Sequence, residues 1–511
     1  MNTEYSINVT KNKLAEAYIH NFSNVESFYE YNIKDAAHLE ERANWLDQAD
    51  HKKADRDMLV KALLAYNTFV DNEDAALQHI HALKQHDALV VIGGQQAGLF
   101  TGPMMVMHKA ITIIQHARAA AKTLKRPVIP VFWIAGEDHD WAEVNHTYVM
   151  DKSQQPCKLT IAKEDENNHS SISYVDIHEN EWHKVITDLA DILPETDFKD
   201  SILDKLYTFS KQSTNLSDFF ARVMSWLFGK YGLVLVDAAD QQMRSLQTEM
   251  FLPMIQQSNE VNALLSQVHD QLQAAGFQPE ASVQEQSMNM FFVKDGKRKL
   301  LFRDGKDIFD KKKQWHLDIA QLEKYATHEP WLLSNNVFTR PIMQEYVFPV
   351  LKTVLGPSEL AYWGMLKDVF QQFQMKLPIL IPRQEYTMVE KAIQKHMTKY
   401  DLTVEDVFFH FDEKKEAWLR KEDTLQLQET FASIKAQFSD LYNPVVENLQ
   451  QINEGIYKLG QKNSQKIIEQ IDYLASKAYH AQQSQSESSI KQWNRIQNSL
   501  IPMGKKWIGY T

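Results

Sequence analysis

The stretch from Ala88 to Thr147 constrains the fold more than any other part of the sequence. Leu89 to Ile92 is a short apolar run that ends at two glycines, as expected of a strand buried on both faces of a parallel sheet. A polar glycine-rich loop follows, and then a predicted helix from Pro103 to Thr123. Val128 to Ile134 predicts a second strand, so a right-handed crossover would make a βαβ unit. Because open α/β sheets bind ligands at the carboxyl edge, we expect the functional site in these loops.

The composition favours a protein that acts on small molecules. Its 511 residues exceed what one hydrophobic core usually supports, so two or three structural units are expected. A formal net charge of −12 and a pI near 5.9 argue against a nucleic-acid partner bound through its phosphates. The single cysteine, Cys157, excludes an internal disulfide and a cysteine-rich zinc site, as is typical of a reducing compartment.

The sequence offers no segment suited to a membrane. The amino terminus lacks the apolar core of a signal peptide, and no apolar run approaches the roughly 20 residues that span a bilayer. We therefore expect a cytoplasmic protein without a membrane partner.

Helices and a small insertion are predicted around the βαβ unit. Residues 1–87 have the apolar spacing of helices. Short alternating pieces at Cys157 to Ile161 and Ser171 to Ile177 predict a β-rich insertion, and helical sequence resumes from Glu181 to Phe228.

Further strands are predicted near the carboxyl end of this region. Gly232 to Val236 predicts a strand that ends at Asp237. Phe348 to Gly356 leads into a loop and a helix start, and Lys376 to Ile381 predicts a strand that precedes Arg383.

A helical segment and a hairpin are predicted between these strands. Met243 to Ala275 reads as a helix with a kink at Pro253. Met288 to Val293 and Lys299 to Arg303 flank Asp295-Gly296, which is a strong hairpin signal. The cations near this turn could hold a phosphate, but a solvated hairpin tip is the favoured interpretation. They are Lys294, Lys297, Arg298 and Lys299.

Beyond Arg383 the sequence becomes helical, with apolar residues at coiled-coil spacing. This seam consists of Leu427, Phe431, Ile434, Phe438, Leu441 and Val445, continued by Leu449, Ile452, Ile456 and Leu459. Gly460 and the polar run after it interrupt the seam, so either two helices fold back antiparallel or one helix bends. Pro444 should kink the first helix. The seam is either an intramolecular arm or a homodimer interface.

The glycine-rich loop from Gly93 to Gly102 ends at a helix amino terminus, where backbone amides suit a phosphate or a carboxylate. It has neither the Rossmann glycine spacing nor the Walker lysine. Two readings therefore stay open, a bound anion and a loop that needs glycine for close packing.

The loop after the second strand carries Glu137, Asp138, His139 and Asp140, with Asn145 close behind. Three readings compete: a Mg²⁺ site serving a nucleotide, a site for an amine or sugar hydroxyls, and an acidic loop that only caps the next helix. A structural zinc is not expected here, and no residue is assigned as a metal ligand. His139 is the best general-base candidate, since imidazole changes charge near neutral pH.

Four more residues are candidates for binding. Lys109, about two turns into the first helix, has a stem long enough to reach a phosphate, whereas His108 is as well explained as a buried, hydrogen-bonded histidine. Arg383 could receive a carboxylate or phosphate in bidentate fashion, and Asp237 could hold a ribose hydroxyl or a metal.

Four blocks, GGQQAGLFTGP, HKA, PVFWIAGEDHDWAEVNH and GPSELAYW, together resemble the bacillithiol biosynthesis cysteine ligase family of low-GC Gram-positive bacteria. The resemblance spans nearly the whole chain. It implies an α/β fold with a Rossmann-like nucleotidyltransferase core and connective-peptide insertions, followed by a C-terminal α-helical coiled coil that can form dimers. The core would occupy residues 1–384, with inserted regions at about 148–230 and 276–345, and the coiled-coil region residues 385–511.

The resemblance also implies a reaction. A ligase of this family joins the carboxyl group of cysteine to the amine of glucosaminyl-malate, the last step to the low-molecular-weight thiol bacillithiol. This chain departs from class I synthetases, since it has neither a His-x-Gly-His motif nor a Lys-Met-Ser-Lys-Ser loop. Family members typically continue beyond the position where this sequence stops, so a shortened carboxyl end is expected.

The leading hypothesis is therefore an amide-forming ligase that uses ATP or a related nucleotide, with Mg²⁺ as a candidate companion. On this hypothesis Asp138 and Asp140 bind the amine or hydroxyls, and His139 assists deprotonation. The residues expected to cradle phosphate or carboxylate are Gln95, Gly98, Thr101 and Gly102.

Two alternatives belong to other classes. A non-catalytic assembly protein with a coiled-coil arm would bind a nucleotide or sugar without converting it. A nucleotidyltransferase would act on another small molecule.

Overall fold

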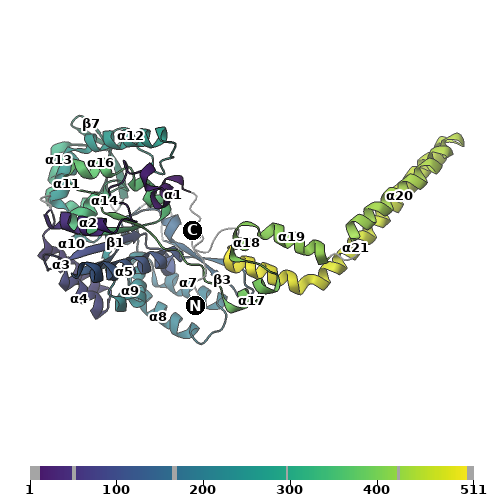
Figure 1. The fold of residues 1–511 in the computed structure, drawn as a ribbon, viewed down its shortest axis with the longest axis horizontal. Coiled ribbons are helices and arrows are strands. Elements are labelled where there is room, and N and C mark those ends of the chain that lie inside the picture. Colours follow the sequence, from purple (N-terminus) through teal and green to yellow (C-terminus); the bar gives the residue numbers. More distant parts are fainter. Residues whose placement is uncertain (1–11, 49–52, 164–169, 295–296, 423–425, 503–511) are drawn as a thin grey trace. The chain divides into compact units, whose positions relative to one another are not determined.

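The computed structural model describes residues 12–48, 53–163, 170–294, 297–422 and 426–502, and Figure 1 shows their helices and strands. The chain divides into two compact units between Tyr386 and Thr387, two residues beyond the sequence-based boundary at 384. Within the described residues, all strands lie in the first unit, and the second unit is helical.

A five-stranded sheet forms the centre of the first unit. Its strand order is β12-β11-β1-β2-β5, and every neighbouring pair is parallel. The strands are β1 (Leu89–Gln95), β2 (Val128–Ile134), β5 (Val234–Asp237), β11 (Val350–Leu355) and β12 (Ile379–Pro382). The four predicted strands at 89–92, 128–134, 232–236 and 376–381 are confirmed, with ends that differ by at most three residues.

The order of the strands reverses at β1. The chain adds β2 and then β5 on one side of β1, and it returns to the other side to add β11 and β12. This doubly wound sheet confirms the predicted Rossmann-like α/β core. The carboxyl ends of β1 and β11 therefore flank the switch point, where open α/β sheets bind ligands.

Both faces of the sheet are buried, which explains why its strands are apolar throughout. Along β1, Val90 and Ile92 belong to one hydrophobic core, and Leu89 and Val91 to another, because side chains alternate across a strand. The crossover helix α5 (Met105–Leu124) buries its apolar stripe in the second core, and it confirms the helix predicted after the glycine loop.

The other helices of the first unit cover this sheet and a smaller one. Four of them confirm the helical prediction for the amino-terminal region: α1 (Lys13–His20), α2 (Ala37–Gln48), α3 (Arg56–Phe69) and α4 (Asp74–Ala82). The others are α6 (Trp141–Val144), α7 (Glu179–Ile192), α8 (Lys199–Lys211), α9 (Leu216–Phe228), α10 (Gln241–Ser245), α11 (Thr248–Gln256), α12 (Ser258–Ala274), α13 (Ile319–His328), α14 (Arg340–Val347), α15 (Pro357–Trp363) and α16 (Lys367–Gln372).

The segment after β2 differs in part from its prediction. A hairpin of β3 (His146–Met150) and β4 (Pro156–Thr160) confirms the first strand of the predicted insertion. The predicted strand at 171–177 is wrong, since a short 3-10 turn, η3 (Ile172–Tyr174), occupies it between two isolated bridges. The predicted helix 243–275 is broken at residues 246–247 and at Gln257, not at its proline.

A second sheet is antiparallel, in the order β10-β6-β7-β8-β9. Its strands are β6 (Ser287–Lys294), β7 (Lys297–Asp304), β8 (Asp307–Asp310), β9 (His316–Asp318) and β10 (Leu333–Asn335). The pairing of β6 with β7 confirms the predicted hairpin, although Asp295 and Gly296 themselves lie outside the described residues. The sequence pattern missed the other three strands because runs of three or four residues carry little periodic signal.

The second unit contains a long antiparallel helix pair. Its helices are α17 (Lys391–Lys399), α18 (Val404–Phe409), α19 (Phe411–Glu422), α20 (Leu427–Asn448) and α21 (Glu454–Leu500). Lys435 on α20 pairs with Asp472 on α21 at 2.7 Å, and Tyr442 accepts a hydrogen bond from Asn463 at 2.8 Å. Residues later in α21 thus meet residues earlier in α20, so the two helices fold back on each other.

The reversal lies at the turn η6 (Leu449–Gln451), and the predicted interruption at Gly460 is wrong. Gly460 lies inside α21, where a Cβ would be 3.1 Å from Val446 Cγ1, so the glycine permits close helix packing. The seam is therefore used within the chain. Leu441 and Leu459 nevertheless stay 77% and 62% exposed, and a homodimer through this pair remains a prediction.

No helix among the described residues combines the length and apolarity that crossing a bilayer would need.

A compact aromatic cluster around Trp493 stabilises the second unit. Its ring lies 5.0 Å from Tyr400, 5.4 Å from Phe411 and 5.8 Å from Trp418, measured between ring centroids, and it is 1% exposed. Because α21 contributes Trp493, α19 contributes Phe411 and Trp418, and Tyr400 directly follows α17, the cluster joins these three helices.

Replacing Trp493 with Ala should destabilise the second unit by about 3–5 kcal/mol, since a buried aromatic side chain would leave a cavity. Calorimetry of the full chain would show an earlier transition, and hydrogen exchange would assign it to α17–α19 and α21. Trp331→Ala, at a position 37% exposed in the first unit, is the matched control. Equal protection of these helices in both variants would contradict the prediction.

Candidate functional site

The residues singled out by the sequence gather at one edge of the parallel sheet. Each of the five strands ends at this edge, and polar side chains lie at or just after each end. They include Gln95 on β1, Glu137 after β2, Asp237 on β5, Glu359 after β11 and Arg383 after β12. The parallel topology alone therefore brings together residues that lie far apart in the sequence.

At the switch point, Lys109 ties the end of β1 to helix α15. Its side chain is 0% exposed, and Nζ donates to Gly94 O at 2.6 Å, to Gln95 Oε1 at 2.9 Å and to Glu359 Oε2 at 2.5 Å. An ammonium group has three donors, so these contacts occupy all of them. The structure thus gives Lys109 a positioning role, in place of the predicted reach to a phosphate.

Glu359 is the second half of this link. Its Oε2 also accepts the N–H of Gly356 at 2.8 Å, which fixes the first turn of α15. Burial acts to raise its pKa, but the ammonium of Lys109 and this N–H outweigh burial, so the pKa is lowered and the carboxylate stays charged. Burial in turn lowers the pKa of Lys109.

The glycine loop is strained and closed on itself. Phe100 and Thr101 have φ angles of 51° and 78°, and Gly102 follows at 69°. Positive φ is unusual for a β-branched residue such as threonine and marks stored strain. A Cβ on Gly98 would lie 2.8 Å from Gly102 Cα, so close packing requires this glycine. The packing reading is thereby supported for Gly98, and the bound anion remains a prediction.

His108 and Arg383 lie near each other beside this loop. His108 is 3% exposed and its ring meets Tyr386 edge-on at 5.5 Å. Burial, and then the charge of Arg383, lower the pKa of His108, so the ring is neutral at pH 7. Arg383 pairs with Glu385 at 2.6 Å, and its side chain is 7% exposed.

In the acidic loop, two carboxylates are neutralised by arginines from distant segments. Glu137 is buried and pairs with Arg244 of α10. Asp138 Oδ1 lies 3.4 Å from Arg298 of β7, and it also accepts the N–H of His139 at 2.8 Å. The loop therefore carries less negative charge than its sequence indicates.

The remaining polar residues of the acidic loop contact their near neighbours in the sequence. Asp140 accepts the N–H of Glu143 at 3.2 Å and is the N-cap of α6, as the simplest sequence reading predicted. Burial, with Asp138 and Asp140 nearby, raises the pKa of Glu143. Asn145 Oδ1 lies 3.1 Å from His146 Nδ1, so this amide faces its neighbour.

His139 is the most accessible of the candidate catalytic side chains. It is 42% exposed, its Nδ1 lies 3.6 Å from Asp138 Oδ1, and its ring is 6.3 Å from the Phe291 ring, edge-on. The side chain is thus placed to accept a proton from a bound group.

Asp237 ends β5 as predicted, but its carboxylate is already engaged within the chain. Its Oδ2 accepts the hydroxyl of Ser173 at 2.7 Å and its Oδ1 accepts the N–H of Ala239 at 2.9 Å, with the residue 5% exposed. Ser173 N–H in turn donates to Gly136 O at 3.0 Å. Asp237 thus supports the acidic loop through Ser173, and a Cβ on Gly136 would collide with both side chains.

The sequence reading missed Arg244, Arg340 and Glu359, and it misjudged Arg298. The side chain of Arg298 is 5% exposed, lies 4.0 Å from the Phe291 ring centroid and donates to Asn335 O at 2.9 Å. The solvated interpretation is therefore wrong for this residue, whereas Lys294 and Lys297 are exposed. Alternation along β7 is the signal that separates Arg298 from its lysine neighbours.

Among the described residues, no group of three or more His, Cys, Asp and Glu side chains is arranged to hold a metal ion. The acidic loop explains why, since Glu137 and Asp138 are paired with arginines and Asp140 caps a helix. A resident Mg²⁺ does not fit this donor set.

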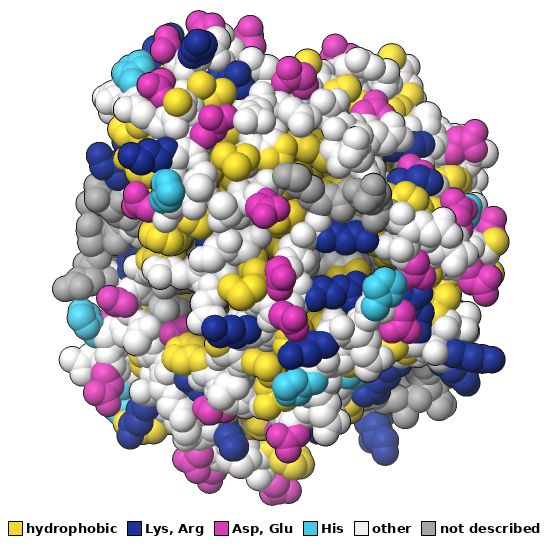
Figure 2. Space-filling view, turned by 90° about the vertical axis from the view of Figure 1, so that its left-hand side faces the viewer, with side chains coloured by type: hydrophobic (Ala, Val, Ile, Leu, Met, Phe, Trp, Pro, Cys, Tyr) yellow, Lys and Arg dark blue, Asp and Glu magenta, His cyan; other side chains and the backbone are white. Residues whose placement is uncertain are grey.

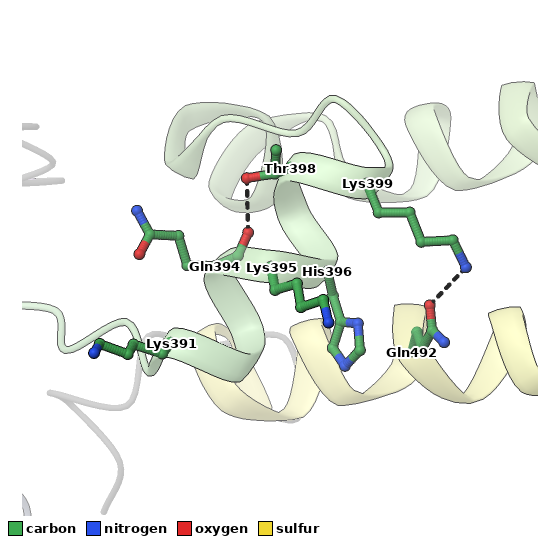
Figure 3. A pocket seen from close by; sticks show the side chains of 7 residues that line it. All are labelled: Lys391, Gln394, Lys395, His396, Thr398, Lys399 and Gln492. Atoms are coloured by element: carbon green, nitrogen blue, oxygen red, sulfur yellow. Dashed lines mark hydrogen bonds between the residues drawn. The ribbon is translucent and has the colours of Figure 1, made fainter.

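A separate open groove lies in the second unit, on α17 and the facing part of α21 (Figure 3). Lys391, Lys395 and Lys399 line it with His396, and Lys399 donates to Gln492 at 2.9 Å. Burial and the nearby cations lower the pKa of His396. Such a lining can attract an anion.

Charges of both signs alternate over the face shown in Figure 2. Lysine and arginine side chains are interleaved there with aspartate and glutamate, without a continuous basic stripe on that face. The face in Figure 2 therefore lacks the basic stripe that is typical of proteins that bind a nucleic-acid backbone.

Comparison with known proteins identifies the family. Residues 1–384 match "Bacillithiol biosynthesis BshC, N-terminal Rossmann-like domain", and residues 386–506 match "Bacillithiol biosynthesis BshC, C-terminal coiled-coil domain". A relative from Geobacillus sp. (strain WCH70) is 33% identical over 96% of this chain and 90% of its own length. A relative from Lysinibacillus sphaericus is 32% identical over 97% of this chain and 90% of its own length. Both are named "Putative cysteine ligase BshC".

The buried Asp237 should make stability depend on pH. Burial raises its pKa from 3.8 to about 7, so the folded chain keeps this proton at pH values where the unfolded chain has lost it. The stabilisation that comes from the protonated carboxyl group of Asp237 is therefore present below about pH 4 and is lost as the pH rises to about 7. The free energy of unfolding of Asp237→Asn minus that of the parent should therefore be higher at pH 8 than at pH 4, by roughly 1–4 kcal/mol.

Denaturant unfolding across this pH range measures the effect. Asp188→Asn, at an exposed position on α7, is the matched control. An unchanged difference between Asp237→Asn and the parent at both pH values would contradict the assignment.

Proposed function

The chain belongs to the bacillithiol biosynthesis BshC family, and we propose that it is a cysteine ligase that joins the carboxyl group of cysteine to the amine of glucosaminyl-malate. One observation carries the proposal. The glycine loop that precedes α5, at the switch point between β1 and β11, and the loop with the accessible His139 lie at the same sheet edge. An amide ligase needs such a pair, one part for anionic groups and one for the attacking amine.

A carboxylate and an amine form a salt when mixed, so the carboxyl group must first be activated. ATP is the proposed source: the carboxylate oxygen attacks the α- or γ-phosphorus, an O–P bond forms, and the P–O bond to the departing pyrophosphate or ADP breaks. The amine then attacks the carbonyl carbon, the new C–N bond forms, and the C–O bond to the phosphorus-bearing group breaks. That group leaves with the electron pair, and the nitrogen loses one proton. Mg²⁺ would arrive bound to the nucleotide phosphates.

The proposed roles follow the two halves of the edge. Gln95, Gly98, Thr101 and Gly102 would position phosphate or carboxylate groups at the start of α5, because helix amino termini favour anions. His139 would take the proton from the attacking amine.

The acidic loop would hold the acceptor substrate. Asp138, Asp140 and Asn145 would contact its amine or hydroxyls, while Glu137 stays paired with Arg244. A cytoplasmic location is proposed as well, since it supplies reduced cysteine and ATP.

The direct test supplies purified protein with ATP, cysteine and glucosaminyl-malate. Bacillithiol should form together with one equivalent of cleaved nucleotide. If neither the thiol product nor nucleotide cleavage is detected, the proposal is wrong.

The role of His139 predicts a specific kinetic effect. His139→Ala should lower kcat by about 100-fold or more, with a small change in KM for cysteine, because loss of a general base affects the transition state chiefly. His81→Ala, at an exposed position on α4, is the matched control and should leave kcat unchanged. A kcat for His139→Ala within about twofold of the parent would exclude it as the base.

A further inference from the structure

Arg340 differs from the other cations at the sheet edge. It is the first residue of α14, and it donates to Gln344 Oε1 at 3.2 Å and to Tyr362 Oη at 3.1 Å. Both acceptors are uncharged. Burial acts to lower the pKa of Arg340, but the phenol of Tyr362 and then the carboxylates of Glu359, after β11, and Glu137, after β2, outweigh burial and raise it. Arg340 therefore contacts helix α15, which follows β11, and its charge also interacts with the acidic loop after β2.

Each of the other four cations has a carboxylate partner. The pairs are Lys109 with Glu359, Arg244 with Glu137, Arg298 with Asp138 and Arg383 with Glu385. Among the described residues, no Asp or Glu oxygen lies within 4.0 Å of the Arg340 guanidinium. One positive charge at this edge is thus left without an ion pair.

An unmatched guanidinium in a partly buried position is suited to a ligand. Withdrawing a charge from water is costly unless an opposite charge compensates it. A guanidinium has five N–H donors in a planar fork, and the two contacts described use only two of them. The residue is only partly buried, so an entering group can reach the remaining donors.

We propose that Arg340, held in place by Gln344 and Tyr362, is a receptor for an anionic group of a substrate, either a carboxylate or a phosphate. The planar fork matches both groups in bidentate geometry. This inference rests on the proposed function, which supplies two sources of the anion: the unreactive carboxylates of the malyl group and the phosphates of the nucleotide. A reacting carboxylate is a poorer match, because a tight ion pair would oppose its activation.

Equilibrium binding by calorimetry tests the receptor without requiring turnover. The full chain is titrated with glucosaminyl-malate in one arm and with ATP in the other. The variants are Arg340→Met, which removes the charge, and Arg340→Lys, which keeps the charge but loses the fork. Arg118→Met, at an exposed position on α5, is the control that removes one positive charge elsewhere.

Arg340→Met should weaken binding in one arm by at least about tenfold, the equivalent of one charge-assisted hydrogen bond, and Arg340→Lys should recover only part of the loss. Tyr362→Phe keeps the charge and should weaken the same arm by about two- to fivefold. It provides a second measurement if Arg340→Met fails to fold. Arg118→Met should bind as the parent does.

The arms separate the outcomes. A loss confined to glucosaminyl-malate identifies a malyl carboxylate as the bound anion, and a loss confined to ATP identifies a phosphate. Unchanged affinity of folded Arg340 variants in both arms overturns the receptor. If the parent chain itself fails to bind glucosaminyl-malate, the proposed substrate is wrong, and the ATP arm still decides the role of Arg340.

Discussion

The contact between Lys109 and Glu359 holds together the two strand ends on which the site depends. Lys109 comes from the crossover helix after β1, and Glu359 from the helix after β11, so this pair spans the switch point of the sheet. The lysine also binds Gly94 O and Gln95 Oε1, which fixes the start of the glycine loop. A buried ammonium is stable only when its donors are satisfied, and here all three are used. The loops at this edge are therefore positioned by a charge that takes no direct part in binding a phosphate.

The same principle extends across the edge to the acidic loop. Glu137 and Asp138 are each held by an arginine from a separate segment, Arg244 from α10 and Arg298 from β7. Arg244 also donates to Leu333 O at 2.7 Å, on β10 of the antiparallel sheet. The smaller sheet and its flanking helices thus supply positive charges to a loop of the larger sheet. Removing either arginine would leave a carboxylate in a site of low polarity, which would distort the loop that carries His139.

Much of the central fold could be predicted from the sequence because its signals are local. A continuous apolar run followed by glycine predicted β1, and the apolar spacing of α5 gave its length to within a few residues. The antiparallel helix pair was among the predicted outcomes, but its turn was misplaced at Gly460. Judged from the local sequence alone, a glycine is a common end of a helix. Here α21 continues through Gly460, because Val446 of the partner helix packs against this position. Packing between helices is not visible in a local pattern.

The site was predictable only in part, for the same reason. Residues at strand ends, such as Gln95 and Asp138, follow from the strand pattern once a parallel sheet is assumed. Arg298 does not, because the parallel and antiparallel sheets must first be placed against each other before it meets Asp138 of the acidic loop. Arg340 does not either, because its contact with Tyr362 joins two helices that lie apart in the sequence. Asp237 shows the converse case. It does end a strand, but the turn at Ser173 occupies its carboxylate, so a strand end alone does not make a ligand-binding residue.

The pairing of charges at this edge narrows the chemistry that its side chains can perform. Arginines occupy the carboxylates of Glu137 and Asp138, and Asp140 caps a helix, so these three residues are better suited to orient groups than to accept protons. His139 is accessible, and imidazole as a chemical group can exchange a proton near neutral pH, which leaves this residue as the group suited to proton transfer. Arg340 complements it, since a cation without a carboxylate partner gains the most from an anionic substrate. A ligase for a substrate that carries both an amine and carboxylates requires both kinds of group, and this edge supplies one of each.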